Sequence, residues 1–267
     1  FVIMTFKRLF IVMAIILLIV NILIYFYSKN LLIAEAVGGR EDFTLNVGYR
    51  FLKLLPLIVL FQKRPFFQYS MFLLCLVFVV LCVKRGAIII AAFCYILFIV
   101  SNLRAHSNRK IAIALTIVSV LFVCYYINYS LNNNEYLIYR FNQVLEGNSS
   151  NRDIIYSNLW EHFIREDNFL KFVFGNGANA TLAIGTNYAH NDWLEIAINN
   201  GILGLIVYLA FYMTLLNEVL KIRNRSPLSS NVILMSFIIL LMTSFFSMSY
   251  SSVGLSIAIA IGYVLAN

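Results

Sequence analysis

Apolar runs recur along most of this sequence, and several approach the length that crosses a lipid bilayer. A transmembrane helix needs about 20 consecutive, predominantly apolar residues. By this criterion the sequence predicts about eight membrane spans. They cover residues 9–27, 44–61, 66–83, 86–103, 111–130, 193–216, 228–246 and 252–266.

The second predicted span is the least certain helix, and the first apolar run must be distinguished from a signal peptide. Residues 44–61 form the weakest span, because Arg50, Lys53 and Pro56 interrupt the apolar pattern, and we expect a tilted or broken helix there. The first run is too long for a signal-peptide core and has no small-residue cleavage site, so we interpret it as a span. Two interpretations of its start stay open: a native start at Met4, or further helices ahead of residue 1.

The composition supports a membrane protein. The chain is 61% hydrophobic and 12% charged, whereas a soluble domain carries about 25% charged residues. The four cysteines all lie inside apolar runs and lack metal-ligand spacing, so we interpret them as buried small residues and predict no disulfide or metal site. They are Cys75, Cys82, Cys94 and Cys124. The predicted fold class is all-α, a polytopic transmembrane helix bundle.

Short groups of basic residues predict the orientation of the spans. They are Lys7 and Arg8; Lys63 and Arg64; Arg104, Arg109 and Lys110; and Lys221, Arg223 and Arg225. If all of them are cytoplasmic, the spans alternate consistently. That side then holds ten of the 20 Lys and Arg residues but one of the 12 acids, Glu218. The net charge of +8 is therefore a topology signal, and scattered juxtamembrane pairs do not predict nucleic-acid binding.

This alternation predicts one large outer loop within a single integral membrane domain. N-terminal helices occupy residues 1–130, the loop residues 131–192 and C-terminal helices residues 193–267. A helix start at residues 150–153 is followed by an apolar stripe that recurs every fourth residue, at Ile155, Leu159 and Phe163. We expect this amphipathic helix to lie along the membrane surface or to pack on the bundle.

The main candidate for chemistry is His190, at the head of the sixth predicted span. A histidine at a membrane interface is more often a hydrogen-bonded structural group, and that alternative stays open. Asn191, Asp192 and Glu195 stand beside it, where polar groups are costly unless they are used. Because the pKa of an imidazole is about 6.5, His190 could take a proton from a hydroxyl group at neutral pH.

Two arginines are candidates for binding an anion. Arg85 follows Lys84 and begins the fourth span on the outer side, where the positive-inside trend disfavours a basic pair. A guanidinium grips a phosphate through two parallel hydrogen bonds, although an interfacial cation that reaches for water is the alternative. Arg152 begins the loop helix, and from the sequence alone a solvated surface charge is the favoured interpretation.

Glycines mark two further places. Gly175 and Gly177 could offer backbone N–H groups to a phosphate, but a plain turn is favoured. Gly201 and Gly204 are interpreted as packing positions in the sixth span. The sequence contains no glycine-rich nucleotide loop, paired acidic metal motif or Ser/His/Asp set, so an enzyme here would have to use a substrate already activated on a lipid.

Four of these features, taken in chain order, carry a resemblance to a known family. They are Arg85-Gly86-Ala87; Arg152 with Tyr156 and Trp160; Phe174-Gly175-Asn176-Gly177; and Ala189-His190-Asn191-Asp192-Trp193-Leu194-Glu195 with Gly201-Ile202-Leu203-Gly204-Leu205 behind it. In this order the sequence resembles the O-antigen ligase and polymerase superfamily of bacterial membrane glycosyltransferases. The His-Asn block with its trailing glycines is the specific part. Members of the superfamily usually have more helices than this chain.

The resemblance implies glycan transfer from undecaprenyl diphosphate at the periplasmic face of the bacterial inner membrane, without a metal ion or another cofactor. It implies that Arg85 and Arg152 bind the diphosphate and that His190 activates or orients the acceptor hydroxyl. The supporting candidates are Asn191, Asp192, Glu195, Gly175, Gly177 and Lys84. The implied partners are the lipid-linked donor, the glycan acceptor and the bilayer, and a chain-length regulator or another assembly protein is a further candidate.

Three functions are compatible with these residues. A polymerase joins lipid-linked repeat units into an O-antigen, capsule or exopolysaccharide, and we favour it. A ligase passes finished polymer to lipid A–core, and transfer to protein is a related possibility. A transporter belongs to a different class and usually carries polar or broken helices near the bilayer midplane. In this sequence the polar residues gather at the outer rim, which favours interfacial chemistry.

Overall fold

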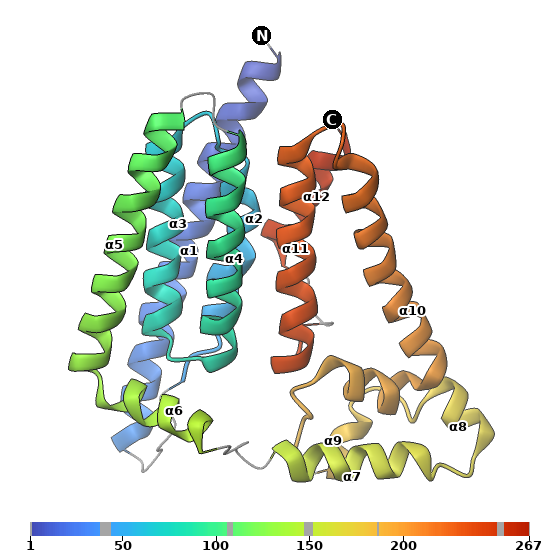
Figure 1. The fold of residues 1–267 in the computed structure, drawn as a ribbon. Coiled ribbons are helices and arrows are strands. Elements are labelled where there is room, and N and C mark those ends of the chain that lie inside the picture. The colour runs from blue at the N-terminus through green and yellow to red at the C-terminus, as the bar shows by residue number, and fades with distance from the viewer. Residues whose placement is uncertain are drawn as a thin grey trace.

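The computed structural model describes residues 2–37, 44–105, 109–146, 152–185, 187–249 and 254–266. Every regular element in these ranges is an α-helix, which confirms the predicted all-α fold. Helices α1 to α5 form one group and α10 to α12 a second, while α6 to α9 lie across one end of the molecule (Figure 1). The helices are α1 (Val2–Val37), α2 (Gly48–Val59), α3 (Pro65–Leu81), α4 (Arg85–Ala105), α5 (Arg109–Asn133), α6 (Glu135–Leu145), α7 (Arg152–Ile164), α8 (Phe169–Phe174), α9 (Ala180–Gly185), α10 (Asp192–Ile222), α11 (Pro227–Phe246) and α12 (Leu255–Ala266).

Helix α2 joins the two groups of helices. It contacts α1, α3 and α4 of the first group and α11 and α12 of the second. All of its 12 residues except Arg50 are buried. Phe51 of α2 stacks on Phe78 of α3 with ring centroids 4.8 Å apart. A helix that is apolar on nearly every side must be surrounded by other apolar groups, and the five neighbouring helices enclose α2.

The predicted count of eight spans is not confirmed. Among the described residues, five helices are long and apolar enough to cross a membrane, and α3 and α12 are apolar but shorter. The five are Leu9–Ala34, Arg85–Arg104, Arg109–Asn133, Asp192–Ile222 and Pro227–Phe246. The weakest predicted span, residues 44–61, contains the short helix α2, whose 12 residues reach about 18 Å against a hydrocarbon core of about 30 Å.

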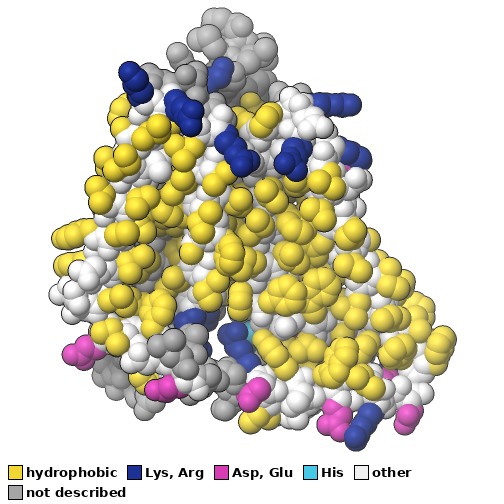
Figure 2. Space-filling view, in the orientation of Figure 1, with side chains coloured by type: hydrophobic (Ala, Val, Ile, Leu, Met, Phe, Trp, Pro, Cys, Tyr) yellow, Lys and Arg dark blue, Asp and Glu magenta, His cyan; other side chains and the backbone are white. Residues whose placement is uncertain are grey.

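Charged side chains of opposite sign gather at opposite ends of the molecule. Figure 2 shows Lys and Arg at the end where the N-terminus lies and Asp and Glu at the end formed by α6 to α9. The orientation predicted from the basic loops requires a separation of this kind. A second, smaller group of basic side chains occupies a recess between the lower ends of the two helix groups, with histidine surface beside it.

The predicted loop region is largely helical, and its middle helix packs on the bundle. Helix α7 begins at Arg152, as the sequence predicted. Leu159 and Phe163 are buried and Ile155 packs against them, which confirms the apolar stripe. The stripe meets Ala197 and Ile198 of α10. The division of the chain at residues 130 and 192 stays a prediction.

Helix α10 is broken at Gly201, which has φ 65° and ψ −163°. The break frees the carbonyl groups of Ile198 and Asn199 from their partners one turn on. Backbone N–H groups from the turn after α8 replace those partners: Asn176 N–H donates to Ile198 O (2.8 Å) and Gly177 N–H donates to Asn199 O (3.1 Å). These two hydrogen bonds satisfy the backbone carbonyl groups of Ile198 and Asn199 at the break.

We predict that Gly201→Ala destabilises the protein by about 2–4 kcal/mol, since a left-handed backbone and a displaced neighbour both carry a cost. A Cβ atom at Gly201 would lie 2.4 Å from the carbonyl oxygen of Val173. Thermal unfolding in detergent measures the effect. Gly262→Ala in α12 is the control, because a Cβ atom there has no neighbour within 4 Å. Equal unfolding temperatures for the two variants would contradict this account of the break.

Candidate functional site

His190 lies in the short segment between α9 and α10, with an exposed side chain and a left-handed backbone (φ 52°). Asn191 behind it caps α10, and its side-chain oxygen accepts hydrogen bonds from the N–H groups of Trp193 (3.0 Å) and Leu194 (3.3 Å). A cap of this kind is favoured at a helix start. Asn191, which the sequence analysis proposed as a supporting residue, therefore holds the backbone next to His190 against the start of α10.

Glu195 holds the chain on the other side of His190. Its carboxylate is fully buried. One oxygen accepts a hydrogen bond from Ala189 N–H at 2.6 Å, and the other accepts from the hydroxyl of Thr181 at 2.7 Å and from the Asn199 side chain at 3.4 Å. A buried carboxylate is tolerated when hydrogen bonds satisfy it. Glu195 is therefore a structural anchor for the residue that precedes His190.

Asp192 is the second fully buried carboxylate of this turn. It accepts hydrogen bonds from the backbone N–H and the hydroxyl of Ser249, both at 2.7 Å, and from the hydroxyl of Tyr208 at 2.7 Å. The positive charge of Lys53 in α2 also interacts favourably with it. Asp192 thus ties the start of α10 to α2 and to the segment that follows α11.

Arg152 comes close to the start of α4 through the last residue of α11. Its guanidinium donates a hydrogen bond to the carbonyl oxygen of Phe246 at 3.3 Å. A Cβ atom at Gly86 would lie 2.8 Å from Cβ of Phe246 and 2.7 Å from the hydroxyl oxygen of Tyr49. Only a glycine permits this approach, so the backbone beside Arg85 lies against the residue that binds Arg152.

The positive charges of this region act on His190. The pKa of its imidazole is lowered, first by partial burial of the ring and then by the nearby charges of Arg152 and Lys84. Both causes disfavour the protonated ring. His190 is therefore neutral at neutral pH and can accept a proton. Arg152, Lys84 and His190 therefore belong to one electrostatic cluster, and Arg85, the first residue of α4, follows Lys84 directly in the chain.

Two positions beside this cluster have left-handed backbones that side chains rarely adopt. Val83, with φ 51°, lies two residues after the end of α3 and directly before Lys84 and Arg85. His190 is the other. Such conformations cost about 1–3 kcal/mol each and gather at functional sites, and for a β-branched valine the conformation is especially unfavourable.

The glycine turn after α8 does not present its N–H groups to a ligand. Gly175 N–H donates to Lys171 O at 2.7 Å, and the N–H groups of Asn176 and Gly177 bind the broken part of α10. The plain turn that the sequence favoured is therefore the correct interpretation. Gly177 and Asn176 donate their N–H groups to carbonyl groups at the break in α10, and Gly175 permits the close approach of this turn to the backbone of Asn199.

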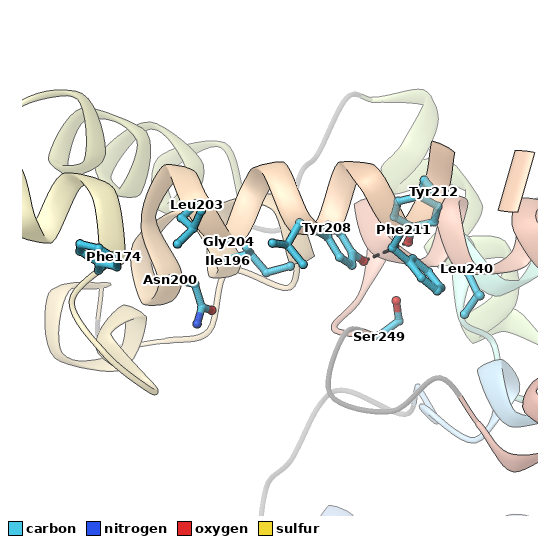
Figure 3. A pocket seen from close by; sticks show the side chains of 11 residues that line it. Phe174, Ile196, Asn200, Leu203, Gly204, Tyr208, Phe211, Tyr212, Leu240 and Ser249 are labelled. Carbon is cyan, nitrogen blue, oxygen red and sulfur yellow. Dashed lines mark hydrogen bonds between the residues drawn. The ribbon is translucent and has the colours of Figure 1, made fainter. Parts of the chain in front are cut away.

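An apolar groove of about 590 Å³ runs along α10. Figure 3 shows Phe174 at one end and Phe211, Tyr212, Leu240 and Ser249 at the other. The hydroxyls of Tyr208 and Tyr212 lie 2.9 Å apart at that second end. Tyr208 and Ser249 both bind Asp192, so the polar end of the groove adjoins the first turn of α10.

Sequence reasoning did not single out Tyr49, Tyr208 or Ser249. No motif marks these three residues in the sequence. Tyr208 and Ser249 bind Asp192, and Tyr49 lies against Gly86, and these contacts are visible only in the folded chain. The sequence signal that could have drawn attention to α2, which carries Tyr49, is the pair of cations Arg50 and Lys53 within a predicted apolar span.

The sequence profile of the family described as "O-Antigen ligase" matches residues 70–209. A curated protein of Salmonella muenchen named "O-antigen polymerase" is 33% identical over 204 residues, which are 69% of this chain and 49% of that protein. The chain thus spans about half the length of this relative. No solved structure matches. Because the matched stretch includes Arg85, Arg152 and His190 and covers more than half of the chain, this protein belongs to the O-antigen ligase family.

Proposed function

We propose that this protein polymerises oligosaccharide repeat units carried on undecaprenyl diphosphate, at the periplasmic face of the bacterial inner membrane. The observation that carries the proposal is the position of His190 directly before the cap of α10, where the positive charges of Arg152 and Lys84 act on its imidazole. A glycosyl transfer from a lipid diphosphate needs both a group that accepts a proton and positive charge near the leaving group. The relative named as a polymerase agrees with this choice.

In the proposed reaction, a hydroxyl oxygen of the acceptor sugar attacks the anomeric carbon of the donor. The bond between that carbon and the phosphate oxygen breaks, and its electron pair stays on the diphosphate. The hydroxyl proton passes to the free nitrogen of His190. Arg85 and Arg152, with Lys84 beside them, bind the diphosphate and offset the charge that develops as it leaves, which is the largest electrostatic demand of the step.

The groove along α10 suits the lipid part of the donor. Its lining is mostly apolar, and its polar end adjoins the turn that carries His190. A polyprenyl chain gains free energy when its methylene groups leave water or a polar interface. We therefore place part of the lipid carrier in the groove and its diphosphate near Arg85 and Arg152.

Two other functions remain as alternatives with different predicted outcomes. A ligase would use the same residues on a finished polymer and a lipid A–core acceptor. A transporter would need polar groups along a path through the bilayer. The cluster of His190, Arg152 and Lys84 at one end of the bundle favours chemistry at the interface instead.

We predict that His190→Ala abolishes the long glycan ladder in a strain that lacks the native gene, leaving a single repeat unit on the acceptor. Loss of a general base reduces the rate by about 10²–10⁴-fold while substrate binding persists. The measurement is a gel profile of surface glycan together with the lipid-linked intermediates.

His162→Ala is the matched control, since that histidine is a half-buried residue of α7 whose Nε2 lies 3.9 Å from Oε2 of Glu166. It should leave the ladder unchanged. Full-length polymer held on the lipid carrier would identify a ligase. A normal ladder with His190→Ala would refute the catalytic role and favour a transporter or a structural protein.

The lowered pKa of His190 predicts where the activity of the protein falls as the pH is lowered. Because burial and two positive charges disfavour protonation, activity should fall only below about pH 6.5, the ordinary imidazole value. Lys84→Gln removes one of these charges, so the acidic limb should move to higher pH. Initial rates with a synthetic lipid-linked repeat unit, at donor concentrations far below saturation, report the pKa of the enzyme before it binds donor and measure the shift.

Lys171→Gln on α8 is the control for this shift. Lys171 is exposed and is not among the charges that lower the pKa of His190. An acidic limb that stays in place with Lys84→Gln would show that the titrating group is not His190.

A further inference from the structure

Arg50 is the exception in an otherwise buried helix. All the other residues of α2 are buried, and the helix is enclosed by α1, α3, α4, α11 and α12. Arg50, in the first turn of α2, is exposed. No hydrogen bond or ion pair of its guanidinium is found among the described residues. A strongly solvated side chain on a central helix must reach an open space at the end of the bundle.

The neighbours of Arg50 on α2 show which open space this is. Tyr49, Arg50 and Lys53 share about a third of the helix circumference, because residues three and four apart lie on the same face. Tyr49 interacts electrostatically with Arg152, and its hydroxyl lies against the start of α4 at Gly86. This face of α2 therefore turns toward the elements that carry Arg85, Arg152 and His190.

Lys53 and Arg50 differ in what they can offer to a ligand. Lys53 is buried, its stem packs against Gly254 and its charge is offset by Asp192. Arg50 is exposed, and its electrostatic interaction with Lys53 is unfavourable. An anion would relieve that repulsion. Of the two cations on this face, Arg50 is the one placed to meet a substrate.

We propose that Arg50 is a third arginine that binds the diphosphate of the lipid-linked substrate, together with Arg85, Arg152 and Lys84. This inference rests on the proposed function. A sugar-linked diphosphate diester carries two negative charges, and cleavage of the sugar–phosphate bond leaves the electron pair, and a third charge, on the diphosphate. A further arginine helps to offset the charge that is added as the bond breaks.

Nothing in the family resemblance assigns this role to Arg50. The matched stretch begins at residue 70, after α2 has ended at Val59. The competing explanation is that Arg50 extends into water at the end of the bundle and meets no ligand, as interfacial cations often do. Direct binding of a diphosphate separates these explanations.

The test is binding of geranylgeranyl diphosphate to the purified full chain in nanodiscs, with geranylgeranyl monophosphate as a second probe. We expect Arg50→Gln to weaken diphosphate binding about tenfold, equivalent to about 1.4 kcal/mol, and to affect the monophosphate less. Arg50→Lys should restore part of the affinity. Unfolding temperatures should match the wild type, because Arg50 is exposed.

Arg165→Gln is the matched control, because Arg165 is an exposed arginine at the same end of the molecule, 2.8 Å from Glu161. It should bind both probes as the wild type does. If Arg50→Gln binds the diphosphate normally while Arg85→Gln does not, the role of Arg50 is refuted and the proposed function stands. If Arg85→Gln also binds normally, the inference and the proposed diphosphate site fail together.

Discussion

The first turn of α10 contains two fully buried carboxylates, and the arrangement of the site depends on them. Asp192 and Glu195 are three residues apart and bind different partners. Glu195 fixes the chain before His190 through Ala189, and Asp192 fixes the segment after α11 through Ser249. Ser249 lies three residues beyond Phe246, which accepts the hydrogen bond from Arg152. The first turn of α10 thus helps to position both His190 and Arg152.

Several features of this region oppose local stability. Arg85 and Arg152 are the first residues of α4 and α7, and α4 has no acid in its first turn. Positive charge at a helix start is disfavoured by the helix dipole, by about 0.3–1 kcal/mol. Val83 and His190 add the cost of left-handed backbones. Positive charges and strain concentrated in one place are expected where the protein binds an anion, because the ligand recovers the electrostatic cost.

The sequence predicts much of this structure but not how its parts meet. Hydropathy found the long helices, because a bilayer-length apolar run has few alternatives, and the stripe of Leu159 and Phe163 predicted the face that α7 buries. Residues 44–61, the weakest predicted span, contain the short buried helix α2, and they show that an apolar run in the sequence does not distinguish a lipid environment from a protein interior. His190, Arg85 and Arg152 were singled out by residue type and order. The partners of Asp192, and the place of Arg50, depend on contacts between residues far apart in the chain, which periodicity does not encode.

In the proposed mechanism, the cations that bind the diphosphate also affect the basicity of His190. Burial of the ring, together with the charges of Arg152 and Lys84, keeps the imidazole neutral before the donor binds. In the proposed reaction a bound diphosphate offsets those charges and therefore raises the pKa of His190, which makes the ring a stronger base when the substrate is present. As the sugar–phosphate bond breaks, the negative charge on the proposed leaving group favours the imidazolium that forms. On this proposal, donor binding and proton transfer are coupled through charge.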